Sequence, residues 1–146
     1  MSFNKDESAG FLANHMARLY AHGLHERIRP LGLAPAQFMC LLELWEEDGI
    51  TQKALRQRLD VEQATMANTL KRMERDGLIV RRPDPADQRA QRIHLTDRAR
   101  ALRDDAIAAA GAQNRASMAN LTKDERAQFV ALMQKVIATM RGDAQD

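Results

Sequence analysis

Hydrophobic residues before position 50 follow helical spacing in two separate runs. The first run spans residues 12–28 and is followed by Pro30 and Gly32, which predict the end of a helix. The second run begins after Pro35, a residue favoured in the first helical turn, and ends at Gly49. The buried stripe of this second helix is expected to contain Phe38, Leu41, Leu42 and Trp45.

Two further helices follow with a tight junction between them. Thr51 is a good N-cap for a helix that continues through Leu59. The next helix is predicted from about Glu62 to Asp76, with Gly77 as its C-terminal stop. Successive residues of a helix lie about 100° apart, so Met66, Leu70 and Met73 share a buried face. The opposite face carries Thr65, Asn68, Arg72 and Arg75, while Gln63 lies in the first turn.

Beyond Gly77 the period changes to two residues, which is typical of β-strands. The first predicted strand sets Leu78 and Val80 on one face and Ile79 and Arg81 on the other. The second strand alternates Ile93 and Leu95 with Arg92 and His94. Residues 83–90 between the strands are polar and too long for a two-residue hairpin turn, so the ribbon is expected to project as a flexible tip.

Two long helices complete the predicted chain. Thr96 caps an alanine-rich helix that begins at Asp97 and ends near Asn120. Thr122 and Glu125 form a capping box for the last helix. One face of that helix carries Phe129, Leu132, Met133, Val136, Ile137 and Met140. Because this is more apolar surface than one small domain covers, we expect a dimer built from residues near both termini.

Composition narrows the class of protein. The 146 residues are 45% hydrophobic and 29% charged, which predicts one folded domain over residues 1–146. No apolar run approaches the ~20 residues that span a bilayer, and charged residues at helical spacing interrupt the first thirty positions, where a signal peptide needs an apolar run. The single cysteine, Cys40, agrees with a reducing compartment. We therefore expect a cytoplasmic protein without membrane partners.

The net charge of +2 conceals an uneven distribution along the chain. Residues 51–100 contain twelve Lys or Arg against seven Asp or Glu, whereas the remaining residues contain ten against thirteen. A basic middle third between acidic flanks indicates a polyanionic partner for that segment, although ordinary protein surfaces also show moderate excesses.

The order of three helices and a basic ribbon between residues 35 and 95 is that of a winged helix-turn-helix. In this fold the third helix reads base edges in the major groove. An arginine at the ribbon tip suits a narrow minor groove. Asp87 is placed to accept hydrogen bonds from an arginine or the loop backbone and so to shape the tip. The ribbon arginines are Arg81, Arg82, Arg89 and Arg92. A solvated helix and loop would show the same residues, so this pattern alone leaves that alternative open.

The sequence also resembles the MarR (multiple antibiotic resistance regulator) family of bacterial regulators. The resemblance rests on Leu33-Ala-Pro-Ala-Gln-Phe38, on Glu74-Arg-Asp-Gly-Leu-Ile-Val-Arg-Arg82, and on Asp84-Pro-Ala-Asp-Gln-Arg-Ala90 followed by Ile93-His-Leu-Thr96. It implies a mainly α fold with a small β-wing, in which residues 33–96 form the DNA-binding lobe and residues 8–30 and 97–142 form dimerisation helices. It further implies Gln63, Thr65, Asn68 and Arg72 as groove-facing positions, and Asp87 with Arg89 as the wing pair.

The function implied is a homodimeric transcriptional regulator, a repressor of a palindromic operator in double-stranded DNA that a small aromatic acid releases. The resemblance places that effector beside His15, Arg18, Met39 and Trp45, although core packing also explains Met39 and Trp45. The alternative function is a dimeric helical module that binds protein partners without sequence-specific DNA binding.

The sequence gives only weak signals for a metal site, a reactive cysteine or an enzyme active site. His22 and His25 share a helix face but lack a third ligand, so we expect no metal site. Cys40 is either a buried, inert thiol or an oxidant sensor. The sequence contains no nucleophile, base and acid set and no phosphate-binding glycine loop. We therefore expect neither enzymatic activity nor a cofactor.

Overall fold

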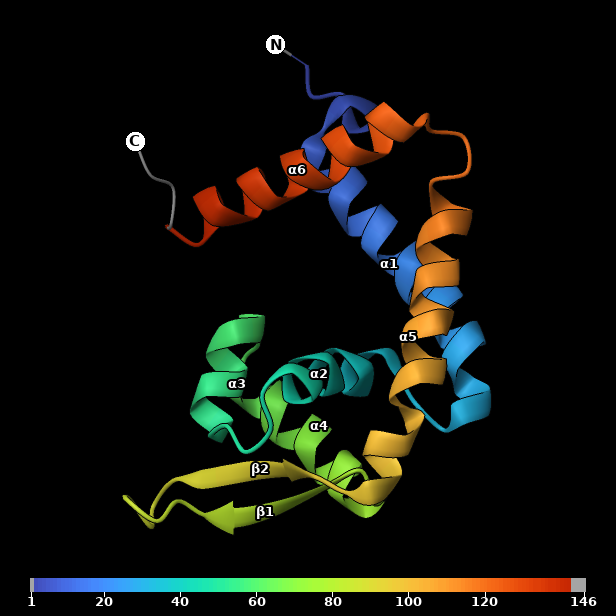
Figure 1. Ribbon diagram of the computed structural model, residues 1–146. Helices are drawn as coiled ribbons and strands as arrows, with labels where there is room; N and C mark the ends of the chain where they lie inside the picture. The colour runs from blue at the N-terminus through green and yellow to red at the C-terminus, as the bar shows by residue number, and fades with distance from the viewer. Residues whose placement is uncertain (1, 143–146) are drawn as a thin grey trace. The chain divides into compact units, whose positions relative to one another are not determined.

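The computed structural model describes residues 2–142, which contain six α-helices, two short 3-10 helices and one two-stranded sheet. The elements in chain order are η1 (Lys5–Glu7), α1 (Ala9–Ile28), η2 (Arg29–Leu31), α2 (Pro35–Glu46), α3 (Gln52–Leu59), α4 (Gln63–Arg75), β1 (Ile79–Pro83), β2 (Gln91–Leu95), α5 (Asp97–Ser117) and α6 (Lys123–Met140) (Figure 1). Met1 and residues 143–146, which the predicted domain range 1–146 includes, lie outside the described residues. Within residues 2–142, no helix combines the length and apolar character that a membrane span requires.

Contacts divide the chain into two compact units between Gly111 and Ala112. Helix α5 therefore begins in the first unit and ends in the second. The first unit contains α1, α2, α3, α4, the sheet and the first part of α5. The second unit contains the end of α5 and α6.

The predicted start of α3 and end of α4 are confirmed by their caps, whereas α5 ends at Ser117, before the predicted end near Asn120. The hydroxyl of Thr51 accepts a hydrogen bond from the backbone amide of Ala54 at 3.1 Å and starts α3. Gly77, with φ of +72°, ends α4 in a left-handed conformation that suits glycine. The amide of Leu78 then donates to the carbonyl of Met73 at 2.9 Å, which satisfies a carbonyl of the last helical turn.

The core of the first unit lies where α2, α3 and α4 meet the sheet. As predicted, Met66, Leu70 and Met73 of α4 are fully buried there. The stripe predicted for α2 is partly wrong, because Leu42 and Trp45 are only half-buried. The α2 residues that are buried are Gln37, Phe38, Cys40, Leu41 and Leu44.

The sheet pairs β1 with β2 in antiparallel register, with Ile79 opposite Leu95 and Arg82 opposite Arg92. Figure 1 shows this ribbon extending past α3 and α4, with its turn at the free end. The predicted alternation is confirmed for β2. It is wrong at β1, because Leu78 precedes the strand and is buried together with Ile79, whereas Val80 is exposed.

In the second unit, the predicted capping box is present at the start of α6. The amide of Glu125 donates to the hydroxyl of Thr122 at 3.1 Å, and the carboxylate of Glu125 accepts from the amide of Thr122 at 2.9 Å. Met140, on the apolar face predicted for this helix, is 82% exposed in the single chain. The apolar face of α6 is largely open to solvent.

Cys40 provides a test of the packing around α2. Burial, with a smaller contribution from the negative charge of Glu43, raises the pKa of its thiol to about 12. Since the thiolate is the reactive form, native Cys40 is expected to react slowly with a thiol reagent between pH 7 and 9, where an exposed cysteine becomes steadily more reactive. Labelling in denaturant is the control and should be fast. Rapid labelling of the native chain at pH 8 would contradict the packing.

Candidate nucleic-acid interface

The outward face of α4 carries polar and cationic side chains. The hydrophobic face of the helix is locked in the core, so the opposite face is fixed in its direction. The predicted groove-facing residues Gln63, Thr65, Asn68, Arg72 and Arg75 are all exposed. Their exposure agrees with the sequence analysis, while their contact with DNA stays a prediction.

Arg75 differs from its neighbours because it already has a partner. Its guanidinium donates to both carboxylate oxygens of Asp76, at 2.9 and 3.3 Å. Asp76 also accepts from the side-chain amide of Gln37 at 2.9 Å. These contacts, first Arg75 and then Gln37, hold the pKa of the Asp76 carboxyl below its usual value. Arg75 is thus held at the end of α4.

The wing tip is shaped by Asp87, as the sequence predicts. One carboxylate oxygen of Asp87 accepts the backbone amide of Arg89 at 3.0 Å and lies 3.7 Å from Nε of the same residue. The carbonyl of Asp87 accepts the amide of Ala90 at 2.9 Å. The tip is therefore a hydrogen-bonded turn that presents the Arg89 side chain, which is 96% exposed, to solvent.

The two arginines of β1 point to opposite faces of the ribbon. Arg82 is exposed, whereas the side chain of Arg81 is only 22% exposed. Arg81 donates to the side-chain oxygen of Gln52 at 3.3 Å, and its Nε lies 3.5 Å from a carboxylate oxygen of Glu74. Arg81, which the sequence analysis counts among the ribbon arginines expected at DNA, thus joins β1 to α3 and α4, and its contact with DNA stays a prediction.

A hollow of about 480 Å³ opens between the start of α3, the first residue of α4 and the wing. Its lining residues are Thr51, Gln52, Lys53, Arg56, Gln63, Arg89, Ala90 and Gln91. This set contains three cations from α3 and the wing, and no carboxylate. The sequence analysis missed the α3 residues Lys53 and Arg56. A signal for them was present in the sequence, because residues 52–58, directly after the N-cap Thr51, contain three basic residues and no acidic one.

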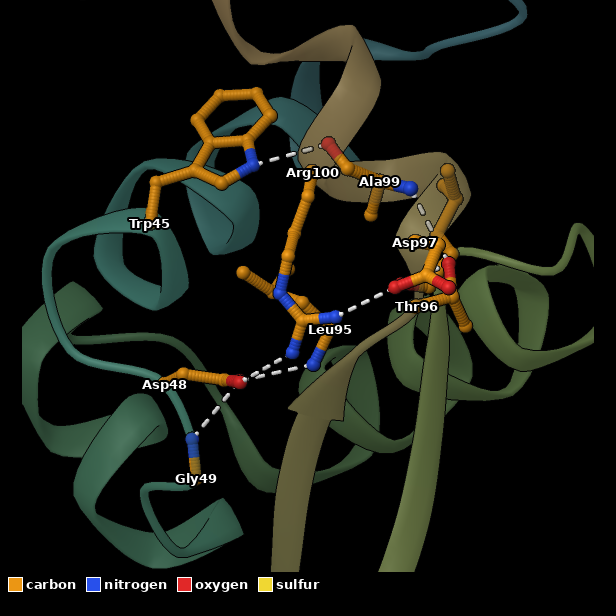
Figure 2. A network of polar contacts seen from close by, with 9 residues as sticks. Trp45, Asp48, Gly49, Leu95, Thr96, Asp97, Ala99 and Arg100 are labelled. Carbon is orange, nitrogen blue, oxygen red and sulfur yellow. Dashed lines mark hydrogen bonds and ion pairs between the residues drawn. The ribbon is translucent and has the colours of Figure 1, made fainter.

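The base of the wing is fastened to α2 and α5 by Asp48 (Figure 2). One oxygen of Asp48 accepts the backbone amides of Gly49 and Leu95, at 2.9 and 2.8 Å. The other oxygen accepts the guanidinium of Arg100 at 3.0 Å, and Arg100 also donates to Asp97 at 3.1 Å. Asp48 thus joins the end of α2, the end of β2 and the first turn of α5.

The residues predicted to line an effector pocket come from α1 and α2 and contact different neighbours. Trp45 donates its indole N–H to the carbonyl of Ala99 at 3.1 Å and lies edge-on to Phe38 (Figure 2 shows the hydrogen bond). His15 lies edge-on to the ring of Phe11, with ring centroids 6.1 Å apart. Arg18 and Met39 are exposed. This pocket stays a prediction. Within residues 2–142, no three side chains of metal-ligating type gather into a site.

Comparisons with known proteins agree on one family. The sequence model of the MarR family matches residues 33–90. The HTH-type transcriptional regulator MgrA of Staphylococcus aureus is 30% identical over 133 residues, which cover 91% of this chain and 89% of MgrA. The chain belongs to the MarR family. The HTH-type transcriptional regulator TtmR of Methylorubrum extorquens is 40% identical over 67 residues, but that alignment covers only 34% of TtmR and 46% of this chain.

Three solved structures share the fold of this chain. A probable transcriptional regulator from Pseudomonas aeruginosa aligns with a TM-score of 0.84 and 28% identity, over 91% of this chain and 99% of that one. Reduced AbfR bound to DNA aligns with a TM-score of 0.76 and 25% identity, over 90% and 89%. PcaV from Streptomyces coelicolor with its natural ligand, at 23% identity, aligns with a TM-score of 0.81 over 94% and 96% and supports the fold alone. This MarR-family chain is a winged helix-turn-helix transcriptional regulator.

Asp48 allows a test of how the wing base is held. Replacing Asp48 by Ala leaves the amide of Leu95 without its acceptor, so the free energy of unfolding in urea should fall by about 1–3 kcal/mol. Asp48→Asn keeps the oxygen acceptor and should retain most of that stability. The matched control is Asp97→Asn, a fully exposed partner of the same arginine, which should change stability by less than about 0.5 kcal/mol. An Asp48→Ala chain as stable as this control would contradict the role assigned to Asp48.

Proposed function

We propose that this MarR-family regulator is a cytoplasmic repressor that binds a palindromic operator as a homodimer and is released by a small ligand. The observation that carries the proposal is the hollow with Lys53, Arg56 and Arg89 on its walls, beside the exposed polar face of α4. Cations without a carboxylate among them favour a polyanion, and the polar helix beside them is suited to base edges.

In this proposal α4 enters the major groove. Gln63, Thr65 and Asn68 are short or flexible enough to donate to base edges near the start of the helix. Arg72 suits a guanine or a phosphate, and Arg75 does so only if it leaves Asp76. The wing follows the DNA to the next minor groove, where Arg82 and Arg89 approach the backbone and Asp87 keeps the tip in shape.

The dimer in this proposal uses the terminal helices, residues 8–30 and 97–142. Its support is the apolar face of α6, where Leu132, Val136 and Ile137 are each 55–56% exposed in the single chain. A single chain rarely leaves such a stripe in water. Two-fold symmetry would then place two copies of α4 about one helical turn of DNA apart, which is the reason for expecting a palindrome.

The effector in this proposal is an aromatic acid that binds beside His15, Arg18, Met39 and Trp45. PcaV, which shares the fold, has been solved with its natural ligand, and we propose that this chain also responds to a ligand. Arg18 would pair with a carboxylate, and Met39 and Trp45 would contact a ring. A screen of aromatic acids for a thermal shift together with loss of DNA binding tests this part separately.

The alternative function is a dimeric module that binds proteins through its helices. Salt distinguishes the two, because counterion release makes DNA affinity fall steeply as salt rises. Selection of bound sites from a random duplex pool is the direct experiment. Recovery of a palindrome supports the proposal, whereas no enrichment and no salt dependence support the alternative.

Variants of the wing and of α4 should affect DNA binding in different ways. Arg89→Ala should weaken binding to operator and scrambled duplex alike and flatten the salt dependence by about one unit per lost contact. Asn68→Ala should instead cost about 1–3 kcal/mol at the base pair it reads and relax preference at positions about ten base pairs apart, with little change in salt slope. Lys5→Ala, which removes an exposed cation outside the DNA-binding lobe and the proposed dimerisation helices, is the control. Unchanged slope and affinity in Arg89→Ala would show that the wing does not touch DNA.

The dimer is tested on the apolar face of α6. Val136→Asp places a charge on a side chain that is exposed in the single chain, so the helix should persist while the dimer dissociates and operator binding weakens. Ala131 lies on the opposite side of α6, and Ala131→Asp is the matched control. Sedimentation measures the oligomeric state of both variants. A wild-type chain that is monomeric at micromolar concentration would disprove the dimer.

A further inference from the structure

Arg92 of β2 makes two strong contacts that point away from a direct role at DNA. Its Nε donates to a carboxylate oxygen of Asp84 at 3.1 Å, in the loop that forms the wing tip. Another nitrogen of the guanidinium donates to the backbone carbonyl of Gly49 at 2.7 Å, in the connection between α2 and α3. One side chain thus joins two segments that lie far apart in the sequence, and we call these contacts, from Asp84 through Arg92 to Gly49, the brace.

Asp84 is the fixed point of the wing tip. It is only 8% exposed, although it lies in a polar loop. Its carboxylate accepts the backbone amide of Ala86 at 3.1 Å, and its own amide donates to the carbonyl of Ala90 at 2.9 Å. The amide of Ala86, followed by Arg92, holds the pKa of the Asp84 carboxyl below its usual value. Asp84 is therefore ionised at neutral pH and closes the loop that carries Arg89.

The other end of the brace is continuous with α3. The amide of Ile93 donates to the carbonyl of Ile50 at 2.8 Å, and the amide of Gly49 donates to the carbonyl of Ile93 at 3.0 Å. Thr51 forms an isolated β-bridge with Arg92 and is also the N-cap of α3. The brace from Asp84 through Arg92 therefore ends at the helix whose cations line the hollow.

We propose that Arg92 and Asp84 are positioning residues for DNA binding, which hold the wing tip at a fixed place relative to α3 so that Arg89 lines the same hollow as Lys53 and Arg56. This inference rests on the proposed DNA-binding function. In this inference neither the Arg92 nor the Asp84 side chain contacts DNA. Both act by removing the need to order the wing at the moment of binding.

Positioning and simple electrostatics predict opposite results at Asp84. If Asp84 acts only as a negative charge near a polyanion, Asp84→Asn should tighten DNA binding. If Asp84 positions the wing, the same variant should weaken binding. Arg92→Lys separates the two ideas again, because lysine keeps the charge but lacks the fork of donors that reaches both Asp84 and Gly49.

The experiment titrates the full chain against the selected operator at several salt concentrations. Asp84→Asn and Arg92→Lys should each lower affinity about tenfold, the equivalent of ordering roughly one more residue on binding. The salt slope should stay unchanged, because no phosphate contact is lost. The double variant should bind no more weakly than either single variant. Matched controls in η1, Asp6→Asn and Lys5→Arg, change an exposed ion pair outside the DNA-binding lobe and the proposed dimerisation helices, and should bind as the wild type does.

Hydrogen exchange provides a readout that needs no DNA. In both variants the amides of Ala86 and Ala90 should exchange faster, while the amide of Leu70 in the core should be unchanged. Equal or tighter DNA binding by Asp84→Asn, or unchanged exchange at the tip, would overturn the inference. If the wild-type chain binds no duplex, the proposed function fails, and the exchange rates still decide whether the brace exists.

Discussion

The attachment of β2 to the segment after α2 is the constraint on which the wing depends. A two-stranded ribbon alone is only marginally stable in water. Here β2 pairs with β1 on one side and with residues 49–51 on the other. Since Thr51 of that segment caps α3, the wing and α3 share one hydrogen-bonded framework. A shift of the strand cannot occur without breaking backbone hydrogen bonds on both sides of it.

This framework divides the basic residues of the ribbon into two kinds. Arg81 and Arg92 are bound to acceptors inside the first unit, at Gln52 and at Gly49. Arg89 is exposed, and its side chain lies 3.7 Å from Asp87. Exposed ion pairs of that kind contribute little to stability and exchange readily for another anion. The direction of a side chain on the strand, more than the number of arginines, decides which charges a polyanion meets.

Sequence patterns predicted the local structure well because caps and periodicity act over a few residues. Thr51 and Gly77 mark helix ends by contacts within five positions along the chain. The inward direction of Arg81 was not predictable in the same way, because its acceptor on Gln52 lies 29 positions away. For the same reason the hollow was missed. Lys53 and Arg89 come together only when β2 pairs with the segment before α3.

The start of α5 links the end of α4, the base of the wing and the end of α2. Thr96 donates its hydroxyl to the carbonyl of Gly77 at 2.7 Å, directly after α4. Arg98 donates to the carbonyl of Asp76 at 3.1 Å, and Arg100 reaches Asp48 at the end of α2. Thr96, between β2 and α5, and Arg98 and Arg100, near the start of α5, thus contact the segments that follow α4 and α2. Because these contacts are short and directional, a change in the direction of α5 must alter the position of the α4 end, the wing base or both.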